Sequence, residues 1–363
     1  MRQEISSRQA GILCFIMMFS SKIIILPSLI YADARDMSIL VLLTSLLFES
    51  LLLYFFIKIK EKYQNSSFFE ILSKYLSKIV AKIIYFLSFV FFIFIILYIL
   101  NESYIYLVDN IYEEATIFLY LLIILSVVSS LAFKGLTALA RTAEFYFVFI
   151  IAGVLVCLLL GFSSISQLEP PNLVSFNFSN YFGSLFKFCY WFGDCIFFVF
   201  ILDNLKVENA YGKRIMRYVF SAIMLLVGIY LCFYFIYKNT SFMHIYAISD
   251  LIKFLGKTIN LEKLNIIPIL IVMFLIFIQV AIYFYCINKC IEKFMPITNK
   301  AQNTIIVLMT VILGILYFQF YNRKVTNILM AFGKYFALIF LVAIPIYLLF
   351  LLLFDKNKKK GEK

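Results

Sequence analysis

Long apolar stretches alternate with short polar connections along the whole chain. A helix needs about 17 to 25 mostly apolar residues to cross a hydrocarbon core of roughly 30 Å. We therefore predict an all-α integral membrane protein with about ten transmembrane helices. The predicted spans are Gln9–Ala32, Met37–Ile57, Ile79–Leu100, Thr116–Phe133, Glu144–Phe162, Tyr181–Leu202, Tyr218–Tyr237, Ile266–Asn288, Gln302–Phe320 and Phe332–Phe354.

Two of the connections are longer, and their apolar residues recur with the period of a helix. Each pattern predicts an amphipathic helix at the membrane surface, one between spans 2 and 3 and one between spans 7 and 8. Helices on opposite sides of the membrane are what two five-helix repeats of inverted topology would give. We therefore expect a single permease-like domain with repeats at 1–165 and 175–355 and a basic tail at 356–363. The apolar residues are Phe68, Ile71, Leu72, Tyr75 and Leu76, then Leu251, Ile252, Phe254, Leu255 and Ile259.

The first helix of each predicted repeat contains a polar interruption. In helix 1, Ser20, Ser21 and Lys22 are followed by Pro27, and in helix 6 the interruption covers residues 191–194. Unwound backbone inside a bilayer must line a polar cavity or be covered by protein. We therefore predict broken helices 1 and 6. The alternative is that the serines form a small-residue packing face and that the glycine of helix 6 marks a close helix crossing.

Four charged residues fall inside predicted spans, where a charge costs about 2.5–3.5 kcal/mol on insertion scales. They are Lys22, Glu49, Lys187 and Asp194. At about 1.5 Å per residue, Lys22 and Asp194 each lie roughly 20 Å from opposite faces of the membrane and so overlap in depth. We expect them to meet, as an ion pair or as the two ends of a ligand site. The alternatives are that Lys22 snorkels while Asp194 caps a half-helix, or that Glu49 is the partner of Lys22.

The second interruption also carries the chain's single tryptophan beside two other aromatic residues. An apolar wall for a small ligand and ordinary core packing are equally good interpretations of these rings. Glu49 and Asp194 are the candidates for ion or proton coupling. The predicted ligand-binding residues are Ser20, Ser21, Lys22, Ile23, Tyr190, Trp191, Phe192, Gly193 and Asp194.

Composition agrees with a membrane protein, because 64% of the 363 residues are hydrophobic and 14% are charged. The formal net charge of +12 does not indicate nucleic-acid binding, since the basic residues cluster between apolar spans and not on a polar face. With the N-terminus inside, most of the 32 lysines and arginines fall in cytoplasmic segments. This bias predicts that both termini face the cytoplasm.

Signals for catalysis or metal binding are weak. The chain has one histidine, His244, and lacks zinc-protease, serine-hydrolase and phosphate-loop motifs. Its seven cysteines form no CxxC pair, and Cys286 and Cys290 offer at most half of a metal site. We expect a protein that is not an enzyme and that uses no cofactor or metal.

Several short motifs resemble the spore germination permease family, the B subunits of nutrient germinant receptors. The resemblance covers nearly the whole chain. Lys22 stands where that family has a small, glycine-rich break, and Ala34 and Ser38 stand where it usually has glycine and tryptophan. The segment near Glu262 lacks the family's arginine and tryptophan. The motifs are Ile5–Gln9, Ile25–Ser28, Ala34–Asp36, Gly135–Leu136, Ala140–Arg141 and Ala143–Glu144, with looser matches in helix 6 and at Ile259–Ile267.

The resemblance implies the fold of the amino acid, polyamine and organocation transporter superfamily. It also implies location in the spore inner membrane, partnership with A and C receptor subunits, and a nutrient germinant as ligand, for which we expect an amino acid. The leading interpretation is a germinant-sensing subunit that binds this ligand between helices 1 and 6 and signals germination. A proton- or cation-coupled amino-acid permease and an assembly subunit with no ligand of its own are the alternatives.

Overall fold

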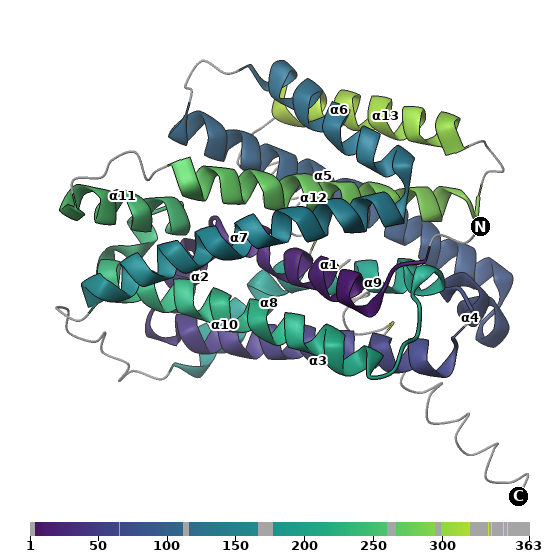
Figure 1. Cartoon of the computed structure of the whole chain (residues 1–363), viewed down its shortest axis with the longest axis horizontal. Helices are drawn as coiled ribbons and strands as arrows, with labels where there is room; N and C mark the ends of the chain where they lie inside the picture. The colour runs from purple at the N-terminus through teal and green to yellow at the C-terminus, as the bar shows by residue number, and fades with distance from the viewer. Residues whose placement is uncertain are drawn as a thin grey trace, which may run out of the picture.

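The computed structural model describes residues 4–64, 66–111, 116–165, 177–259, 266–294 and 299–319, with single positions at 333, 335, 344 and 347. All the regular elements of these residues are helices, and they pack side by side along one long direction (Figure 1). The helices are α1 Ser7–Phe19, α2 Leu26–Ala34, α3 Ser38–Lys62, α4 Phe68–Tyr75, α5 Lys78–Asn110, α6 Ile117–Lys134, α7 Leu136–Ile165, α8 Phe178–Phe188, α9 Phe197–Phe200, α10 Tyr211–Tyr237, α11 Ala247–Ile259, α12 Ile266–Ile291 and α13 Asn299–Gln319.

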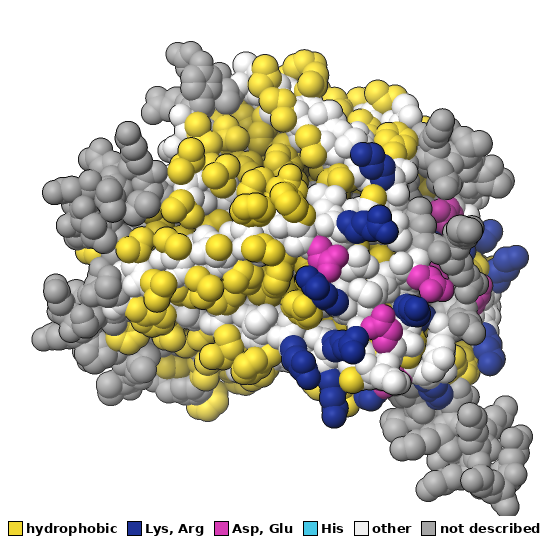
Figure 2. Space-filling view, in the orientation of Figure 1, with side chains coloured by type: hydrophobic (Ala, Val, Ile, Leu, Met, Phe, Trp, Pro, Cys, Tyr) yellow, Lys and Arg dark blue, Asp and Glu magenta, His cyan; other side chains and the backbone are white. Residues whose placement is uncertain are grey.

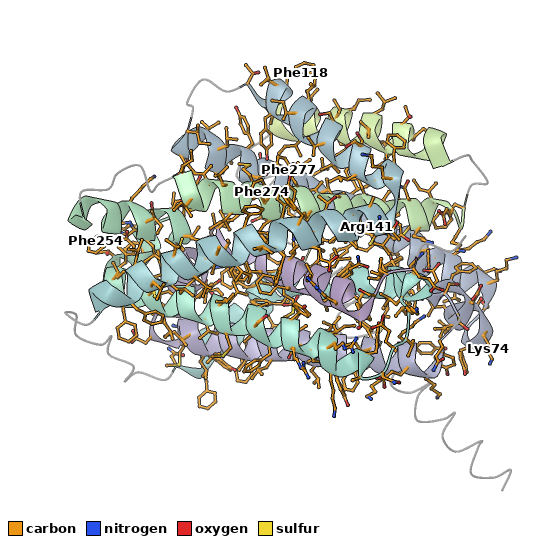
Figure 3. The ribbon with its side chains drawn as sticks, in the orientation of Figure 1. Lys74, Phe118, Arg141, Phe254, Phe274 and Phe277 are labelled. Atoms are coloured by element: carbon orange, nitrogen blue, oxygen red, sulfur yellow. The ribbon has the colours of Figure 1, made fainter. Side chains whose placement is uncertain are left out.

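Seven stretches of the described residues are long and apolar enough to cross a membrane. Large apolar side chains remain exposed on them, such as Phe118, which points outward from α6 (Figure 3), and lipid is the environment that such side chains fit. The fold is therefore that of an all-α, multi-pass membrane protein. The predicted total of ten spans stays a prediction, because only four single positions of the predicted span Phe332–Phe354 are described. The seven stretches are Leu26–Lys62, Lys78–Asn110, Ile117–Lys134, Leu136–Phe162, Phe178–Phe200, Tyr211–Tyr237 and Ile266–Ile291.

The two predicted surface helices are present as α4 and α11. Ser67 caps α4 by accepting a hydrogen bond from the backbone of Glu70, whose side chain accepts one from the Ser67 backbone in return. Figure 1 places α4 and α11 at opposite ends of the molecule, as expected. The order of elements is also similar in the two halves, with a broken helix, a long helix, a short surface helix and further long helices. The inverted relation between the halves stays a prediction.

Two helices begin earlier than hydropathy indicated. The fifth span was predicted from Glu144, but α7 begins at Leu136, directly after Gly135 ends α6 with a positive φ of 83°. The seventh was predicted from Tyr218, but α10 begins at Tyr211. Hydropathy detects only the part of a helix that lies in lipid, and charged residues extend both helices beyond that part.

Most described lysines and arginines on the viewed face lie toward the end of the molecule that carries α4. Figure 2 shows these side chains gathered with acidic ones there, beside a broad apolar surface. Arg141 and Lys74 lie toward this end, and Phe254 lies at the opposite end (Figure 3). The charge distribution thus separates a polar end from a lipid-facing belt, and the predicted orientation of the termini stays a prediction.

Candidate functional site

The first helix breaks where the sequence predicted. α1 ends at Phe19, a 3-10 turn covers Ser21–Ile23, and α2 begins at Leu26 with Pro27 in its first turn, where proline fits a helix. We call residues 20–25 the first break.

Backbone carbonyl groups in and directly after the first break accept hydrogen bonds from other elements. The hydroxyl of Tyr230 donates to the carbonyl oxygen of Lys22 at 3.2 Å, and the backbone N–H at the start of α11 donates to the carbonyl of Ile24 at 3.0 Å. Tyr234 donates to the carbonyl of Pro27 at 3.0 Å. Because buried backbone groups need partners, these bonds from α10 and α11 make the break possible inside the membrane.

The sixth predicted span is also broken. After α8 ends at Phe188, 3-10 turns cover Cys189–Phe192 and Asp194–Ile196, and the short helix α9 follows. We call residues 189–196 the second break. The Ile196 N–H donates to the carbonyl of Gly193 at 3.1 Å, so a hydrogen bond of this break closes within its own turn. A Cβ atom on Gly193 would come no closer than 3.5 Å to its nearest neighbour, so the alternative of a close helix crossing there is wrong.

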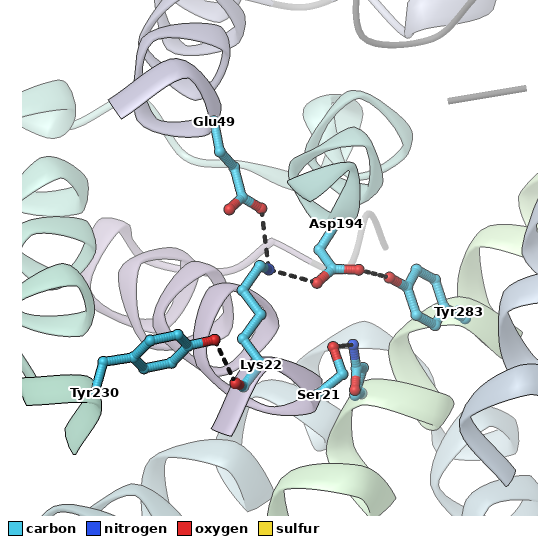
Figure 4. Close-up of polar contacts among 7 residues, drawn as sticks. Ser21, Lys22, Glu49, Asp194, Tyr230 and Tyr283 are labelled. Atoms are coloured by element: carbon cyan, nitrogen blue, oxygen red, sulfur yellow. Dashed lines mark hydrogen bonds and ion pairs between the residues drawn. The ribbon is translucent and has the colours of Figure 1, made fainter. Parts of the chain in front are cut away.

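The structure brings Lys22 and Asp194 together, as predicted. The Lys22 ammonium lies 2.7 Å from Asp194 Oδ2 and 3.4 Å from Glu49 Oε1, so both anticipated partners contact it (Figure 4). Lys22 and Glu49 are fully buried, and the Asp194 side chain is 6% exposed. The ring of Phe192 lies 5.6 Å from the ammonium. The idea that Lys22 snorkels to the surface is therefore wrong, because its amine is held at the junction of the two breaks.

Lys22, Glu49 and Asp194 form an ion cluster with two carboxylates and one ammonium group. Tyr283 of α12 donates a hydrogen bond from its hydroxyl to Asp194 Oδ1. Glu49 Oε2 is buried without a hydrogen bond of normal geometry among the described residues, although the backbone N–H of Cys195 lies near this carboxylate. A buried acceptor without a good partner is costly, so Glu49 has capacity for a proton or a ligand donor.

A small cavity lies beside the ion cluster between the two breaks. Its volume is about 20 Å³, which is enough for one water molecule. Even the smallest amino acid is several times larger than water, so the structure has this site closed. The predicted residues Ser21, Tyr190, Trp191 and Asp194 line the cavity, joined by Ile95, Tyr98 and Ile99 of α5.

The remaining predicted residues surround the cavity without lining it. Ser20 and Ile23 are fully buried in the core around the first break, and Phe192 contacts Lys22. Trp191, by contrast, lines the cavity, and its Nε1 makes no hydrogen bond of normal geometry with the described residues, although the Tyr190 hydroxyl lies near it. Tyr190 and Trp191 thus form part of the cavity wall, whereas Phe192 packs in the core. Both interpretations of the aromatic segment therefore apply.

Lys187 does not join the site. It lies on α8, half exposed, in an ion pair with Asp33, whose second oxygen accepts a hydrogen bond from Ser184 at 2.6 Å. This ion pair explains why a lysine is tolerated in the predicted span.

The sequence analysis did not predict the tyrosines around the ion cluster or Gln279. Tyr283 and Gln279 stand four residues apart on the buried face of α12, and Gln279 donates to Ser21 Oγ at 3.5 Å. A glutamine inside an apolar span was a usable signal, because a polar group there needs a partner. Tyr230 and Tyr283 gave no signal, since 25 tyrosines are spread along the chain.

Two broken helices with a site between the breaks are typical of transporters that open a central ligand site to one side of the membrane and then to the other. The chain resembles in fold a Na⁺-coupled sialic acid symporter solved in a substrate-bound, outward-open state with a novel Na⁺ site. The TM-score is 0.64 at 12% identity, over 93% of this chain and 78% of that one. At this identity the likeness concerns the fold alone.

The particular family follows from the sequence match. Residues 4–327 match the family described as spore germination protein, and the chain belongs to this family of spore permeases. A search among curated proteins found no match. The family assignment expected from the short motifs is therefore confirmed, together with a transporter-like membrane fold.

Proposed function

We propose that this protein is a germinant-sensing subunit that binds a small nutrient, an amino acid, between the first and second breaks. The observation that carries the proposal is the closed cavity beside the Lys22–Asp194 ion pair. An amino acid carries both a carboxylate and an ammonium group. Its carboxylate can replace Asp194 at Lys22, and its ammonium can replace Lys22 at Asp194 or bind Glu49.

Ligand binding at this site requires a change of conformation, because a cavity of about 20 Å³ cannot admit an amino acid. The two breaks must move apart, which separates Lys22 from Asp194. A ligand shifts such an equilibrium only by its difference in affinity for the two states. The ionic contacts that the ligand takes over from the protein supply that difference in the open state.

The signal passes from the first break to the rest of a receptor. The carbonyl of Ile24 accepts a hydrogen bond from the N–H of Ala247 at the start of α11, so movement of the first break reaches the surface helix directly. In this proposal the protein works with A and C receptor subunits in the spore inner membrane, with both termini in the cytoplasm. It acts by binding and movement, without catalysis.

A second function is favoured by the excess carboxylate in the ion cluster. Glu49 and Asp194 face one lysine in a buried site, so a proton or cation has a place there. Such a site would suit a permease that couples amino-acid uptake to a proton or cation. Transport needs the cavity to open to both sides in turn, whereas sensing needs it to open to one.

Two measurements test these functions. In spores from a strain lacking the gene, the sensor proposal predicts loss of germination with one nutrient in a panel of single amino acids, restored by the wild-type gene. An unchanged germination profile would count against it. Uptake of labelled amino acids by the purified protein in proteoliposomes, dependent on a proton or cation gradient, would instead establish the permease.

A further inference from the structure

A second cavity lies away from the broken helices, between the start of α1 and the first turns of α10. Its volume is about 390 Å³, far larger than that of the closed site. Three of its five lining side chains are arginines, and the others carry hydroxyl groups. The lining residues are Arg8, Arg214, Arg217, Tyr218 and Ser221.

Two of the arginines are oriented by acidic residues behind them. Arg8 Nε lies 3.0 Å from Glu144 Oε1, and Arg214 Nη1 lies 2.9 Å from Glu208 Oε2. Each guanidinium has five N–H donors in a planar fork, so each carboxylate occupies only part of that capacity. The ion pairs therefore orient the guanidinium groups of two side chains that are at least half exposed, and they leave other donors free for an anion.

The third arginine makes no ion pair with the described residues. Arg217 is exposed on α10, one turn before Ser221 on the same face of the helix. With Arg8, Arg214 and Arg217 against Glu144 and Glu208, the pocket retains positive charge. Three guanidinium groups around one cavity are the arrangement that proteins use to bind phosphate oxygens.

The pocket is built by close packing of α1 on α10. A Cβ atom at Gly11 would come within 2.3 Å of the Tyr218 ring, so the absence of a side chain at Gly11 lets this ring lie flat against α1. The same ring packs edge-on against Phe147 of α7 at 5.8 Å. Tyr218 is thereby fixed as the wall between the arginines and the helix core.

The face of α10 that carries Arg217 becomes apolar and lipid-facing within two turns. Phe220 is 63% exposed and Met224 is 57% exposed. From Arg217 to Met224 the helix rises about 10 Å, which is the length of several acyl carbons. Figure 2 shows the same change on this face of the molecule, from charged side chains to a continuous apolar surface.

We propose that this pocket binds the phosphate of an anionic phospholipid, with the acyl chains lying along Phe220 and Met224. A phosphate group alone would satisfy the arginines. The adjoining lipid-facing surface favours the lipid over a soluble phosphate, because a soluble anion gains nothing from apolar contact. The site is separate from the closed cavity and does not depend on the sensor or permease function.

The test uses the full-length protein in detergent, titrated with phosphatidylglycerol or phosphatidylcholine and followed by native mass spectrometry. Arg217→Gln removes the arginine that makes no ion pair with the described residues, and the matched control Lys213→Gln removes a charge from the same helix outside the pocket. We expect phosphatidylglycerol to bind more tightly than phosphatidylcholine. Arg217→Gln should weaken this binding about fivefold, the usual contribution of one basic residue, and Lys213→Gln should change it less than twofold.

Equal effects of Arg217→Gln and Lys213→Gln would overturn the proposal, as would equal affinity for the two lipids. Inorganic phosphate tests whether the pocket binds a soluble anion instead of a lipid. Displacement of phosphatidylglycerol by inorganic phosphate at the same concentration would overturn the lipid assignment and identify a soluble anion site. Thermal unfolding of both variants in phosphatidylcholine checks that each is folded, so a loss of binding can be assigned to the pocket.

Discussion

The two breaks satisfy their backbones in different ways. Backbone carbonyls in and directly after the first break accept hydrogen bonds from Tyr230, Tyr234 and the start of α11. At the second break, a hydrogen bond closes within a 3-10 turn, and the links to the first break are made by side chains, chiefly Asp194. The first break is therefore held by its surroundings, whereas the second is held by one buried ion cluster.

This difference indicates which part moves when the site opens. Separating the breaks through the second one costs the ionic contact of Asp194 with Lys22, which a ligand can replace. Moving the first break away from α10 and α11 costs several backbone hydrogen bonds, which a ligand at the cavity does not replace. We therefore expect the two breaks to move relative to each other, with the first break, α10 and α11 moving together as one unit.

The largest expected effect is that of Lys22→Met, which keeps the length of the side chain and removes the charge. It leaves Asp194 and Glu49 buried without a cation, which costs about 3–5 kcal/mol of unfolding free energy. The loss is measured by comparing the unfolding of the variant and the wild type in the same detergent. The control is Lys187→Met, whose half-exposed ion pair should contribute less than about 1 kcal/mol. Equal losses in the two variants would show that the cluster does not join the breaks.

Tyr283→Phe should have the next largest effect. It removes a hydrogen bond to the buried carboxylate of Asp194, and bonds to charged groups contribute about 1.5–3 kcal/mol. The same unfolding measurement applies. If the second break is held by the ion cluster, combining Tyr283→Phe with Lys22→Met should cost less than the sum of the two single changes. Simple additivity would argue against one coupled cluster.

Tyr230→Phe should destabilise by about 1 kcal/mol, because it removes a neutral hydrogen bond to the backbone of the first break. The matched control is Tyr211→Phe on the same helix. The hydroxyl of Tyr211 is buried without a partner among the described residues, so its loss should be neutral or stabilising. A loss from Tyr211→Phe as large as that from Tyr230→Phe would mean that the bond to Lys22 O contributes nothing specific.

The smallest expected effect is that of Gly193→Ala in the second break. The added methyl group has ordinary room, so stability should change by less than about 0.5 kcal/mol. Gly11→Ala is the contrast, because its methyl group would overlap the Tyr218 ring and cost about 1–3 kcal/mol. A severe loss from Gly193→Ala would show that the second break is packed as tightly as the helix crossing at Gly11.

Much of the fold could be predicted from the sequence, because length and hydropathy decide which segments must lie in lipid. The meeting of Lys22 and Asp194 followed from depth alone, since two charges at the same depth in a bilayer lower each other's cost. The helix starts at Leu136 and Tyr211 were missed, because those turns extend outside the apolar region.

The hydrogen-bond donors of the site could not be predicted. Tyr230, Tyr234 and Tyr283 look like any aromatic residue of an apolar helix, and only the packing of α10 and α12 brings their hydroxyls to the breaks. The size of the cavity also could not be predicted from the sequence, because it depends on how closely Tyr98 and Trp191 pack against each other.

Spore germination with a Lys22 variant tests directly whether a ligand binds between the two breaks. A strain lacking the gene is complemented with wild type, Lys22→Gln or Lys187→Gln, with protein amounts matched by immunoblot, and germination is scored over a panel of single amino acids. If a ligand binds between the two breaks, Lys22→Gln should lose or change the nutrient response while Lys187→Gln retains it. A Lys22→Gln protein present in normal amount with the wild-type nutrient profile would contradict a ligand site at the two breaks.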